Sequence, residues 1–531
     1  MNTVLTRNIK TCILIVIACL IALSVSCMKY RGGDINYVNS DATWHSMLTL
    51  QAYEETSPAV HKFLPLVTLG ASEDKYISWG SAIPDKHGNY YYTSFSAAGY
   101  ALPYAFIRLF GLPVSERSLY IFGSFLYVIS ASLWGLFLFK IFGNFFAGLA
   151  GAAAYVFSPE IMHGMGVAYW HHSVMQAALI LQAFAYYSYR TEGSKTARNV
   201  FLFLCAVNPY IEWTGYTANA GYMAAEIFSP HESKESSWKN ARLIFVLTVL
   251  SGVLFCLHYL VNTRVYDFLL ALAKRFFARN FAGSLAREIT GKDPSFVMPS
   301  FFDLAKGYAH SFAFLWVLPA LLFIVNCIMY RSFSWLKECM TVKRFWLVII
   351  LAAPLIENII MKEHAVSYAF DRMKGIFLLS FVICDFSCAF IRGMKAENFG
   401  RIILACLIGI VCFMNYREYS GNEAYIWHEE YRKSNRAIAE YISSRYTLDN
   451  SVVGLDNSVR GYITLLFERG VHELVDIDEL KKICAEKGKR YAVLLVPSDR
   501  KVSGSMTELS GAVIYDTEEG RTEYYNHGDN K

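Results

Sequence analysis

Long apolar runs separated by short polar segments dominate the first 415 residues of the chain. The runs cover residues 12–28, 118–141, 145–158, 167–189, 198–213, 215–229, 242–262, 311–330, 344–361, 373–391 and 400–415. An upright helix needs about 20 mostly apolar residues to cross a bilayer. The pattern therefore predicts a polytopic α-helical membrane protein with about eleven transmembrane helices.

Basic residues set the predicted orientation of these helices. Lys and Arg collect in four segments, around residues 190–198, 234–242, 331–344 and 392–401. Because cytoplasmic loops are enriched in Lys and Arg, we expect these segments inside the cell. The first run is either a retained helix or a cleaved signal peptide, and both alternatives place the segment that follows it outside the cytoplasm.

The first run leads outward and the run 118–141 leads inward, so the apolar stretch 97–110 between them cannot cross the membrane. We expect an interfacial helix over 97–110. We expect a second interfacial helix over 267–281. Everything after residue 415 is then on the outer side. The predicted domains are a transmembrane domain over 1–415, which includes the outer loop 29–117, and a soluble C-terminal domain over 416–531.

The C-terminal domain alternates between amphipathic helical and strand patterns. The predicted helices cover residues 427–445, 458–468 and 478–487, and the predicted strands cover 452–455, 471–475 and 491–496. Such alternation is typical of a small α/β unit.

Composition agrees with a membrane protein. Of the 531 residues, 54% are hydrophobic and 18% are charged, whereas soluble domains carry about 25% charged residues. This balance excludes a disordered chain. A net charge of +5 with no basic stripe argues against a nucleic-acid partner.

The first outer loop carries the leading candidates for catalysis, Asp34 and Asp41. A carboxylate just above the membrane can act as a general base or position a metal. Trp44 and His45 lie one helical turn beyond Asp41, where the indole can stack on a sugar or prenyl group. The alternative role for Asp41 is an N-cap, because Ser40-Asp41 precedes a helical pattern.

A tyrosine cluster follows later in the same loop and includes Tyr91 and Tyr92. It suits a wall that contacts a lipid-linked substrate, and an aromatic belt at the membrane interface is the alternative.

Two further outward junctions contain polar residues at membrane depth. His171 and His172 are adjacent, so on a helix they point about 100° apart and are poorly placed to share one ion. We therefore favour a polar cavity lining or an ordinary interfacial placement for both His171 and His172 over a metal site. Glu212 lies in a tight turn between two spans, where an acid is a functional candidate and a plain polar turn is the alternative.

The last outward junction combines acids and cations. On a helix, His364, Tyr368 and Asp371-Arg372 share one face. Arg372 and Lys374 at an outer helix start run against the usual charge distribution. They suggest a phosphate to be neutralised, with pairing to Asp371 or Glu363 as the alternative.

These features together resemble the GT-C class of membrane glycosyltransferases, which includes protein O-mannosyltransferases, the aminoarabinose transferase and oligosaccharyltransferase catalytic subunits. The resemblance covers the whole architecture and includes a soluble C-terminal domain. The residues that carry it are Asp34 and Asp41, Gly99-Tyr-Ala-Leu-Pro103 with Arg108-Leu-Phe-Gly111, Ser158-Pro159, Glu363-His364-Ala-Val-Ser-Tyr368 and Asp371-Arg372.

The resemblance implies a polyprenyl-phosphate-linked sugar as donor and an inverting attack by the acceptor. It implies Asp41, or secondly Asp34, as the general base, and Arg372 and Lys374 as the residues that hold the donor phosphate. The adjacent Asp-Glu pair that many members carry is not found near Asp41. The choice of base and the need for a divalent cation, Mg or Mn, therefore stay open.

We accordingly expect a glycosyltransferase that modifies a cell-envelope glycan, lipid or protein on the outer face of a bacterial-type inner membrane. Two alternatives remain. An O-antigen-type polymerase or ligase should depend on Arg and His of the outer loop, and a transporter or flippase should show inverted repeats and broken helices, which the sequence does not display.

Overall fold

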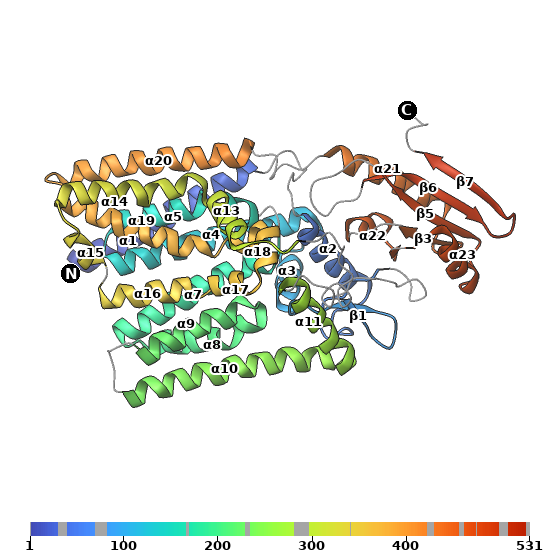
Figure 1. The fold of residues 1–531 in the computed structure, drawn as a ribbon, viewed down its shortest axis with the longest axis horizontal. Coiled ribbons are helices and arrows are strands. Elements are labelled where there is room, and N and C mark those ends of the chain that lie inside the picture. The colour runs from blue at the N-terminus through green and yellow to red at the C-terminus, as the bar shows by residue number, and fades with distance from the viewer. Residues whose placement is uncertain are drawn as a thin grey trace. The chain divides into compact units, whose positions relative to one another are not determined.

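The structure is a computed structural model that describes residues 2–29, 40–69, 82–165, 169–228, 234–280, 297–339, 341–421, 429–455, 461–473, 475–498 and 508–526 (Figure 1). The chain forms two compact units. Unit 1 consists of Met1–Ile35, Leu119–Phe255 and Val297–Tyr425, and unit 2 consists of Asn36–Ser118, Cys256–Phe296 and Ile426–Lys531.

Unit 1 is built from helices, and its long helices run side by side (Figure 1). The helices that lie in it wholly or mainly are α1 (Asn2–Lys29), α4 (Glu116–Phe142), α5 (Phe145–Val156), α6 (Pro159–Gly164), α7 (His171–Glu192), α8 (Lys195–Ile211), α9 (Thr214–Phe228), α10 (Lys234–Leu260), α13 (Phe301–Phe312), η2 (Ala313–Trp316), α14 (Val317–Tyr330), α15 (Ser334–Cys339), α16 (Val342–Ala352), α17 (Leu355–Ile360), α18 (Lys362–Ser367), η3 (Ala369–Arg372), α19 (Gly375–Gly393) and α20 (Glu397–Gly421).

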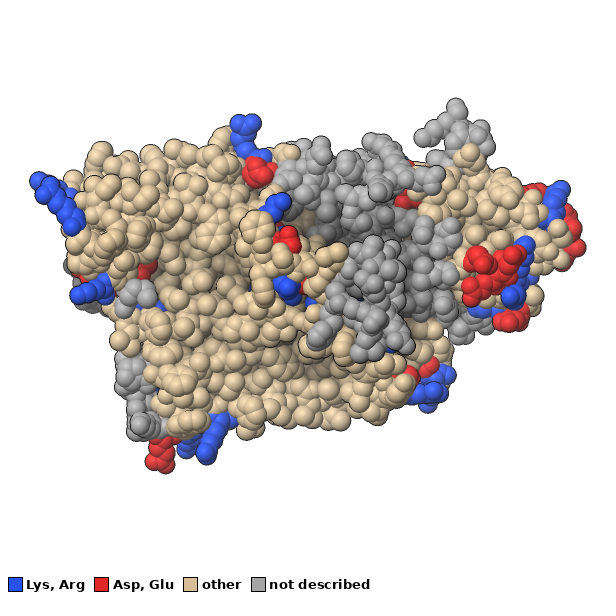
Figure 2. All heavy atoms as spheres, viewed as in Figure 1, with Lys and Arg blue, Asp and Glu red and all other residues tan. Residues whose placement is uncertain are grey.

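Six helical segments among the described residues are long and apolar enough to cross a membrane: Asn8–Lys29, Glu116–Phe142, Glu235–Leu260, Phe301–Tyr330, Gly375–Gly393 and Glu397–Gly421. Large parts of the helical surface in Figure 2 carry no charged side chain. Both observations support the predicted multi-pass membrane protein. The predicted number of eleven spans is not confirmed, because α8, α9 and α16 have 17, 15 and 11 residues, fewer than an upright span needs.

A buried amide network explains why α7, α8 and α9 are less apolar than a lipid-facing helix. The Gln182 side chain donates to Asn219 Oδ1 at 2.9 Å and accepts from Asn208 Nδ2 at 2.8 Å. Asn219 in turn donates to Thr248 Oγ1 of α10 at 2.8 Å. Interhelical hydrogen bonds between amides hold membrane helices together, so these polar residues serve packing inside the bundle.

The connection between α7 and α8 is short because both helix ends are capped. Gly193 ends α7 in the left-handed conformation at φ 64°, which favours glycine. Ser194 then caps α8, accepting a hydrogen bond from the Ala197 backbone N–H at 3.2 Å. Two antiparallel neighbours result, which carry His172 and Glu212 at the same end of the bundle.

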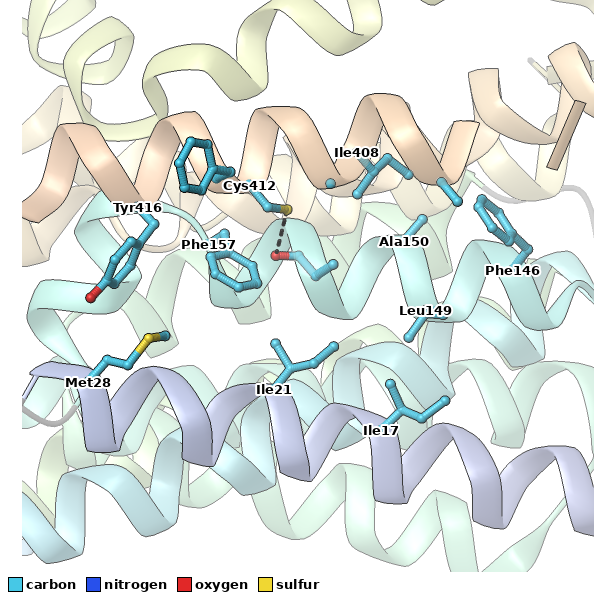
Figure 3. Close-up of a pocket in the computed structure, with 14 residues that line it drawn as sticks. Ile17, Ile21, Met28, Phe146, Leu149, Ala150, Phe157, Ile408, Cys412 and Tyr416 are labelled. Carbon is cyan, nitrogen blue, oxygen red and sulfur yellow. Dashed lines mark hydrogen bonds between the residues drawn. The ribbon is translucent and has the colours of Figure 1, made fainter. Parts of the chain in front are cut away.

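An apolar pocket of about 520 Å³ lies between α1, α5 and α20 (Figure 3). Its wall includes Ile17 and Ile21 of α1, Leu149 of α5, and Ile408 and Gly409 of α20. No heavy atom lies within 4 Å of the position that a Cβ would take on Gly409. The pocket therefore has room for an unbranched or prenyl hydrocarbon chain.

Unit 2 combines helices with two sheets. Its elements are α2 (Ser40–Glu55), β1 (Ala82–Pro84), β2 (Tyr90–Tyr92), α3 (Ala98–Leu109), α11 (Val265–Asn280), α21 (Glu429–Arg445), β3 (Ser451–Leu455), α22 (Gly461–Phe467), β4 (His472–Glu473), α23 (Ile477–Glu486), β5 (Tyr491–Pro497), β6 (Leu509–Asp516) and β7 (Arg521–Asn526).

The five-stranded sheet has the order β4-β3-β5-β6-β7. The pairs β3–β4 and β3–β5 are parallel, whereas β5–β6 and β6–β7 are antiparallel. A C-terminal α/β sheet domain is thus present as predicted, with β6 and β7 in addition to the predicted strands. Helices α3 and α11 are present where interfacial helices were predicted, and their placement on the outer face stays a prediction.

The core of unit 2 joins the first loop to the C-terminal segment. Trp44 of α2 is 1% exposed and packs in a cluster with Ile438 and Ile442 of α21 and with Val453 of β3. Its indole N–H donates to Glu116 Oε1 at 2.9 Å. The compact unit therefore draws on both predicted domains, because the first loop supplies a central side chain of the core.

Trp44→Ala should lower the melting temperature of the purified protein, because removing a buried Trp side chain costs about 3–5 kcal/mol of stability. Trp44→Phe should retain most of the stability. Tyr524→Ala, which changes a side chain that is 80% exposed, serves as the control and should leave the melting temperature unchanged. An unchanged melting temperature for Trp44→Ala, with weaker substrate binding, would favour the predicted stacking role over the core role.

Candidate functional site

A cluster of buried charged side chains forms where α7, α8, α17 and α19 of unit 1 approach one another. His172 lies at the start of α7, Glu212 follows α8, and Glu357 belongs to α17. Asp371 lies in η3, and Lys374 directly precedes α19. All five side chains are buried. We call these five residues, together with His364 and Thr214, the Asp371 cluster.

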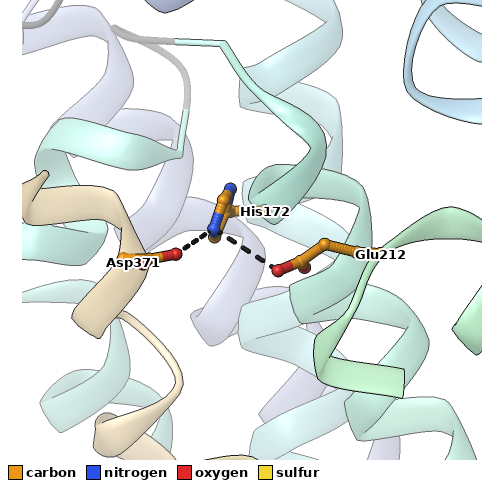
Figure 4. A group of neighbouring side chains, drawn as sticks. All are labelled: His172, Glu212 and Asp371. Atoms are coloured by element: carbon orange, nitrogen blue, oxygen red, sulfur yellow. Dashed lines mark hydrogen bonds and ion pairs between the residues drawn. The ribbon is translucent and has the colours of Figure 1, made fainter. Parts of the chain in front are cut away.

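Asp371 lies at the centre of the cluster between two imidazoles. One of its carboxylate oxygens hydrogen-bonds His172 Nε2, and the other lies 2.5 Å from His364 Nδ1. His172 Nε2 also lies 3.4 Å from Glu212 Oε1 (Figure 4). Because a carboxylate only accepts hydrogen bonds, each imidazole nitrogen that faces Asp371 carries the hydrogen in this arrangement.

Thr214 connects the Glu212 side of the cluster to Lys374. Its hydroxyl lies 2.8 Å from Glu212 Oε1 and 2.6 Å from Glu357 Oε2. Lys374 donates to Thr214 Oγ1 at 3.0 Å and forms an ion pair with Glu357. One hydroxyl thus fixes the separation between two carboxylates and one ammonium group.

The turn between α8 and α9 brings Glu212 and Thr214 inward. Glu212 is extended, with φ −160° and ψ 155°, and α9 begins two residues later. A Cβ on Gly215 would lie 2.3 Å from the Asn208 carbonyl carbon, so only glycine permits this close approach. The turn around Asp371 is held by Asn358, whose side-chain amide donates to the Asp371 backbone carbonyl at 3.1 Å.

Electrostatics keeps Asp371 ionised. Burial acts to raise the pKa of its carboxyl group, but the neighbouring His364, Lys374 and His172 outweigh burial and hold the pKa well below its usual value. A carboxyl group with a depressed pKa stabilises the fold above its unfolded pKa of about 3.9, and this stabilisation is lost as the pH falls further. Asp371 is therefore an anion at neutral pH.

Arg372 forms a second buried group beside the cluster. Its guanidinium lies 3.0 Å from Glu160 Oε1, donates to Ser311 Oγ at 2.7 Å and donates to the Ala365 carbonyl at 2.5 Å. The structure pairs Arg372 with an acid that is neither Asp371 nor Glu363, the two acids suggested by the sequence. It is Glu160 of α6, which sequence spacing alone does not connect to Arg372.

The structure gathers several predicted site residues in unit 1. Glu212, His364 and Lys374 belong to the Asp371 cluster, and the Tyr368 ring lies 4.6 Å from the His364 ring. His171 is buried and faces Trp170 edge to face at 4.9 Å.

Sequence reasoning noted His172 and Asp371 without selecting them as site residues, and it did not select Thr214 or Glu357. The signal that could have found His172 is its place beside His171 at an outward junction. The signal for Asp371 is its spacing from His364, which on a helix places the two side chains on one face.

The predicted site residues of the first loop lie in unit 2 where they are described. His45 is buried with its ring 4.3 Å from the Tyr92 ring. The Tyr91 hydroxyl lies 2.9 Å from His61 Nδ1, and the Tyr92 hydroxyl accepts from Arg275 at 2.8 Å.

The two candidate bases are Asp34 and Asp41. Asp34 lies outside the described residues. Asp41 is in the first turn of α2, and its side chain lies outside the described part of the chain.

Three solved structures share the fold over most of this chain. They are the archaeal oligosaccharyltransferase AglB from Archaeoglobus fulgidus with an inhibitory peptide and a dolichol-phosphate (TM-score 0.54, 12% identity, 98% of this chain and 74% of that chain), the A. fulgidus oligosaccharyltransferase in complex with Zn and sulfate (0.53, 13%, 91% and 68%), and ArnT from Cupriavidus metallidurans bound to undecaprenyl phosphate (0.52, 10%, 92% and 93%). No family model matches the sequence, and no curated protein matches it.

Identities of 10–13% establish likeness of fold. The chain is a polytopic membrane protein with the fold of the GT-C class. The resemblance predicted from the sequence is confirmed at this level, since its structural neighbours include both an oligosaccharyltransferase and ArnT.

Arg372→Met should destabilise the protein by about 3–5 kcal/mol, because it leaves the buried Glu160 carboxylate without its partner. The double variant Glu160→Gln with Arg372→Met should recover part of this loss. The matched control is the pair Glu54–Arg108, whose side chains are 34% and 62% exposed, and Arg108→Met should cost at most about 1 kcal/mol. Equal melting temperatures for Arg372→Met and Arg108→Met would contradict a structural role for the buried pair.

Proposed function

We propose that the protein transfers a sugar from a polyprenyl-phosphate donor to a glycan, lipid or protein acceptor of the cell envelope. The observation that carries this proposal is a GT-C fold over 92–98% of the chain, shared with proteins whose structures contain dolichol-phosphate and undecaprenyl phosphate. The buried acids and cations of the Asp371 cluster add a polar centre to an otherwise apolar bundle, as a membrane-embedded active site requires.

In this proposal the reaction takes place on the outer face of an inner membrane, and the C-terminal domain is periplasmic. Asp41 is the general base that removes the proton from the acceptor, and Asp34 is the second candidate. Their place soon after the first helix in the sequence supports this assignment. A positioned carboxylate base contributes about 10²–10⁴-fold to rate.

Arg372 and Lys374 remain our candidates for the donor phosphate. Both side chains are ion-paired with protein carboxylates, Arg372 with Glu160 and Lys374 with Glu357. To contact a phosphate, each cation must either bind the phosphate together with its carboxylate partner or release that carboxylate. Of the two, Lys374 is the stronger candidate, because four acceptors already surround the Arg372 guanidinium.

A divalent cation is part of the proposal. The sequence favours Mg or Mn, and a neighbour with this fold has been solved in complex with Zn. The buried His, Glu and Asp of the Asp371 cluster support a cation in unit 1.

The apolar pocket between α1, α5 and α20 is our candidate for the prenyl tail. Phe157 lines the pocket, three residues before Glu160 of the Arg372 pair. A tail in the pocket would thus pass near the segment of chain that carries a site residue.

Asp41→Asn should abolish sugar transfer, with a loss of at least about 100-fold. The assay supplies purified protein to membranes that contain lipid-linked sugars and detects the product by mass spectrometry. Because Asn has nearly the same shape as Asp and both are tolerated in the first turn of a helix such as α2, this substitution removes the base with little other change.

Asp478→Asn is the control for the loss of a carboxylate, since the Asp478 side chain is 78% exposed on α23; it should transfer normally. The Asp34→Asn/Asp41→Asn double variant decides the assignment. Full activity of this double variant would show that the base is a different group.

Gly409→Phe should weaken the use of long-chain donors by filling the pocket. Losing burial of two methylene groups costs about 1.6 kcal/mol, which raises the apparent KM about tenfold. Ile410→Phe is the control, because Ile410 is on the same helix and 56% exposed outside the pocket. A donor with a short prenyl chain should not respond to Gly409→Phe; an equal response of short and long donors would contradict tail binding here.

A further inference from the structure

Three side chains of the Asp371 cluster present ligand atoms to a common point. His172 Nε2, one Glu212 oxygen and one Asp371 oxygen all lie within 4.8 Å of one another, and all three side chains are buried. Figure 4 shows the imidazole between the two carboxylates. Ligands about 2.1 Å from a tetrahedral zinc ion are about 3.4 Å apart, which matches the 3.4 Å between His172 Nε2 and Glu212 Oε1.

Acids outnumber the fixed cations of the cluster. Glu212, Glu357 and Asp371 supply three carboxylates, and Lys374 is the one ammonium group paired with them. The neighbouring Arg372 is matched by Glu160. Because uncompensated buried charge is costly, the two further positive charges come either from the imidazoles of His172 and His364, which contact Asp371, or from one divalent cation.

Hydrogen bonds from neighbouring side chains already hold the two carboxylate ligands in place. His364 Nδ1 binds the Asp371 oxygen that faces away from His172. The Thr214 hydroxyl holds Glu212 Oε1, and Lys374 donates to the same hydroxyl. Metal sites depend on such second partners, which orient carboxylate ligands and tune their basicity.

We propose that His172, Glu212 and Asp371 bind one divalent transition-metal ion. The ion takes the place of the hydrogen between His172 Nε2 and Asp371, so the contact between these two residues opens to admit it. One imidazole with two carboxylates suits Zn²⁺ or Mn²⁺, whereas Mg²⁺ favours oxygen ligands and retained waters. The structure thus favours Zn²⁺ or Mn²⁺ over Mg²⁺.

Three protein ligands leave a fourth position of a zinc site open to an exogenous ligand. When bound, the ion supplies a positive charge for a phosphate oxygen of the donor. This catalytic part rests on the proposed function, whereas binding of the ion does not. Binding and transfer are therefore measured separately.

The experiment uses the full chain purified in detergent with an affinity tag that contains no histidine. After treatment with a chelator, the protein is equilibrated with Zn²⁺ alone, and bound zinc is counted by mass spectrometry. We expect about one zinc per chain and a higher melting temperature. Replacement with Co²⁺ should give visible absorption bands of a cobalt ion bound to nitrogen and oxygen.

Glu212→Gln and Asp371→Asn keep the shape of the side chains and remove a ligand charge, and His172→Ala removes the nitrogen. Each should lose the bound zinc and the cobalt absorption. His258→Ala, at a half-buried histidine of unit 2 that lies outside the cluster, should bind zinc as the unchanged protein does. Thermal unfolding without metal identifies any variant that fails to fold, and Glu212→Gln and Asp371→Asn provide two independent tests of the site.

No zinc or manganese on the unchanged protein would overturn the site, and so would zinc that persists in the folded Glu212→Gln and Asp371→Asn variants. Zinc binding in a protein that transfers no sugar would leave the site standing and reject the proposed function. Full transfer after complete removal of metal would reject the catalytic role of the ion and leave the glycosyltransferase standing.

Discussion

The charge of Asp371 is the constraint on which the arrangement of unit 1 depends. This carboxylate is fully buried in η3, yet its neighbours hold it in the ionised form. A buried anion is tolerated only with close partners. His172 of α7, His364 of α18 and the chain around Asn358 of α17 meet this need. The carboxylate therefore fixes where these helices converge.

Compared with well-packed apolar side chains, such a cluster is a poor source of stability. Replacing buried charges by well-packed apolar side chains is often neutral or stabilising, and the surrounding bundle packs with apolar groups throughout the pocket between α1, α5 and α20. A group of acids, imidazoles and an ammonium ion at one end of that bundle is thus best explained by chemistry performed on a charged substrate. A lipid phosphate has the required character, since it joins a charged head to an apolar tail.

Apolar runs in the sequence predict most of the membrane architecture because hydrophobic length is a local property. They locate α1, α4, α10, α19 and α20. The same reasoning does not settle α8 and α9, whose polar residues such as Asn208 and Asn219 are satisfied by partners on other helices. Strand β7 was not predicted because its residues are mostly exposed and lack the alternation that marks a half-buried strand.

The candidate site was predicted in part for a similar reason. Glu212, His364 and Lys374 are visible in the sequence because ionisable residues at the outward ends of apolar runs depart from the usual composition of membrane helices. The pairing of His172 with Asp371, and of Arg372 with Glu160, spans 199 and 212 residues, and only the fold brings such partners together. Trp44 shows the opposite case, since a side chain predicted to contact substrate lies in the core of unit 2.

The central claim is that this chain consumes a lipid-linked sugar, and the lipids of cells that lack the protein test it most directly. Mass spectrometry of their membrane extract should show a polyprenyl-phosphate sugar that accumulates and returns to its normal level when the unchanged protein is restored. A lipid-linked sugar pool that is the same with and without the protein would contradict the account.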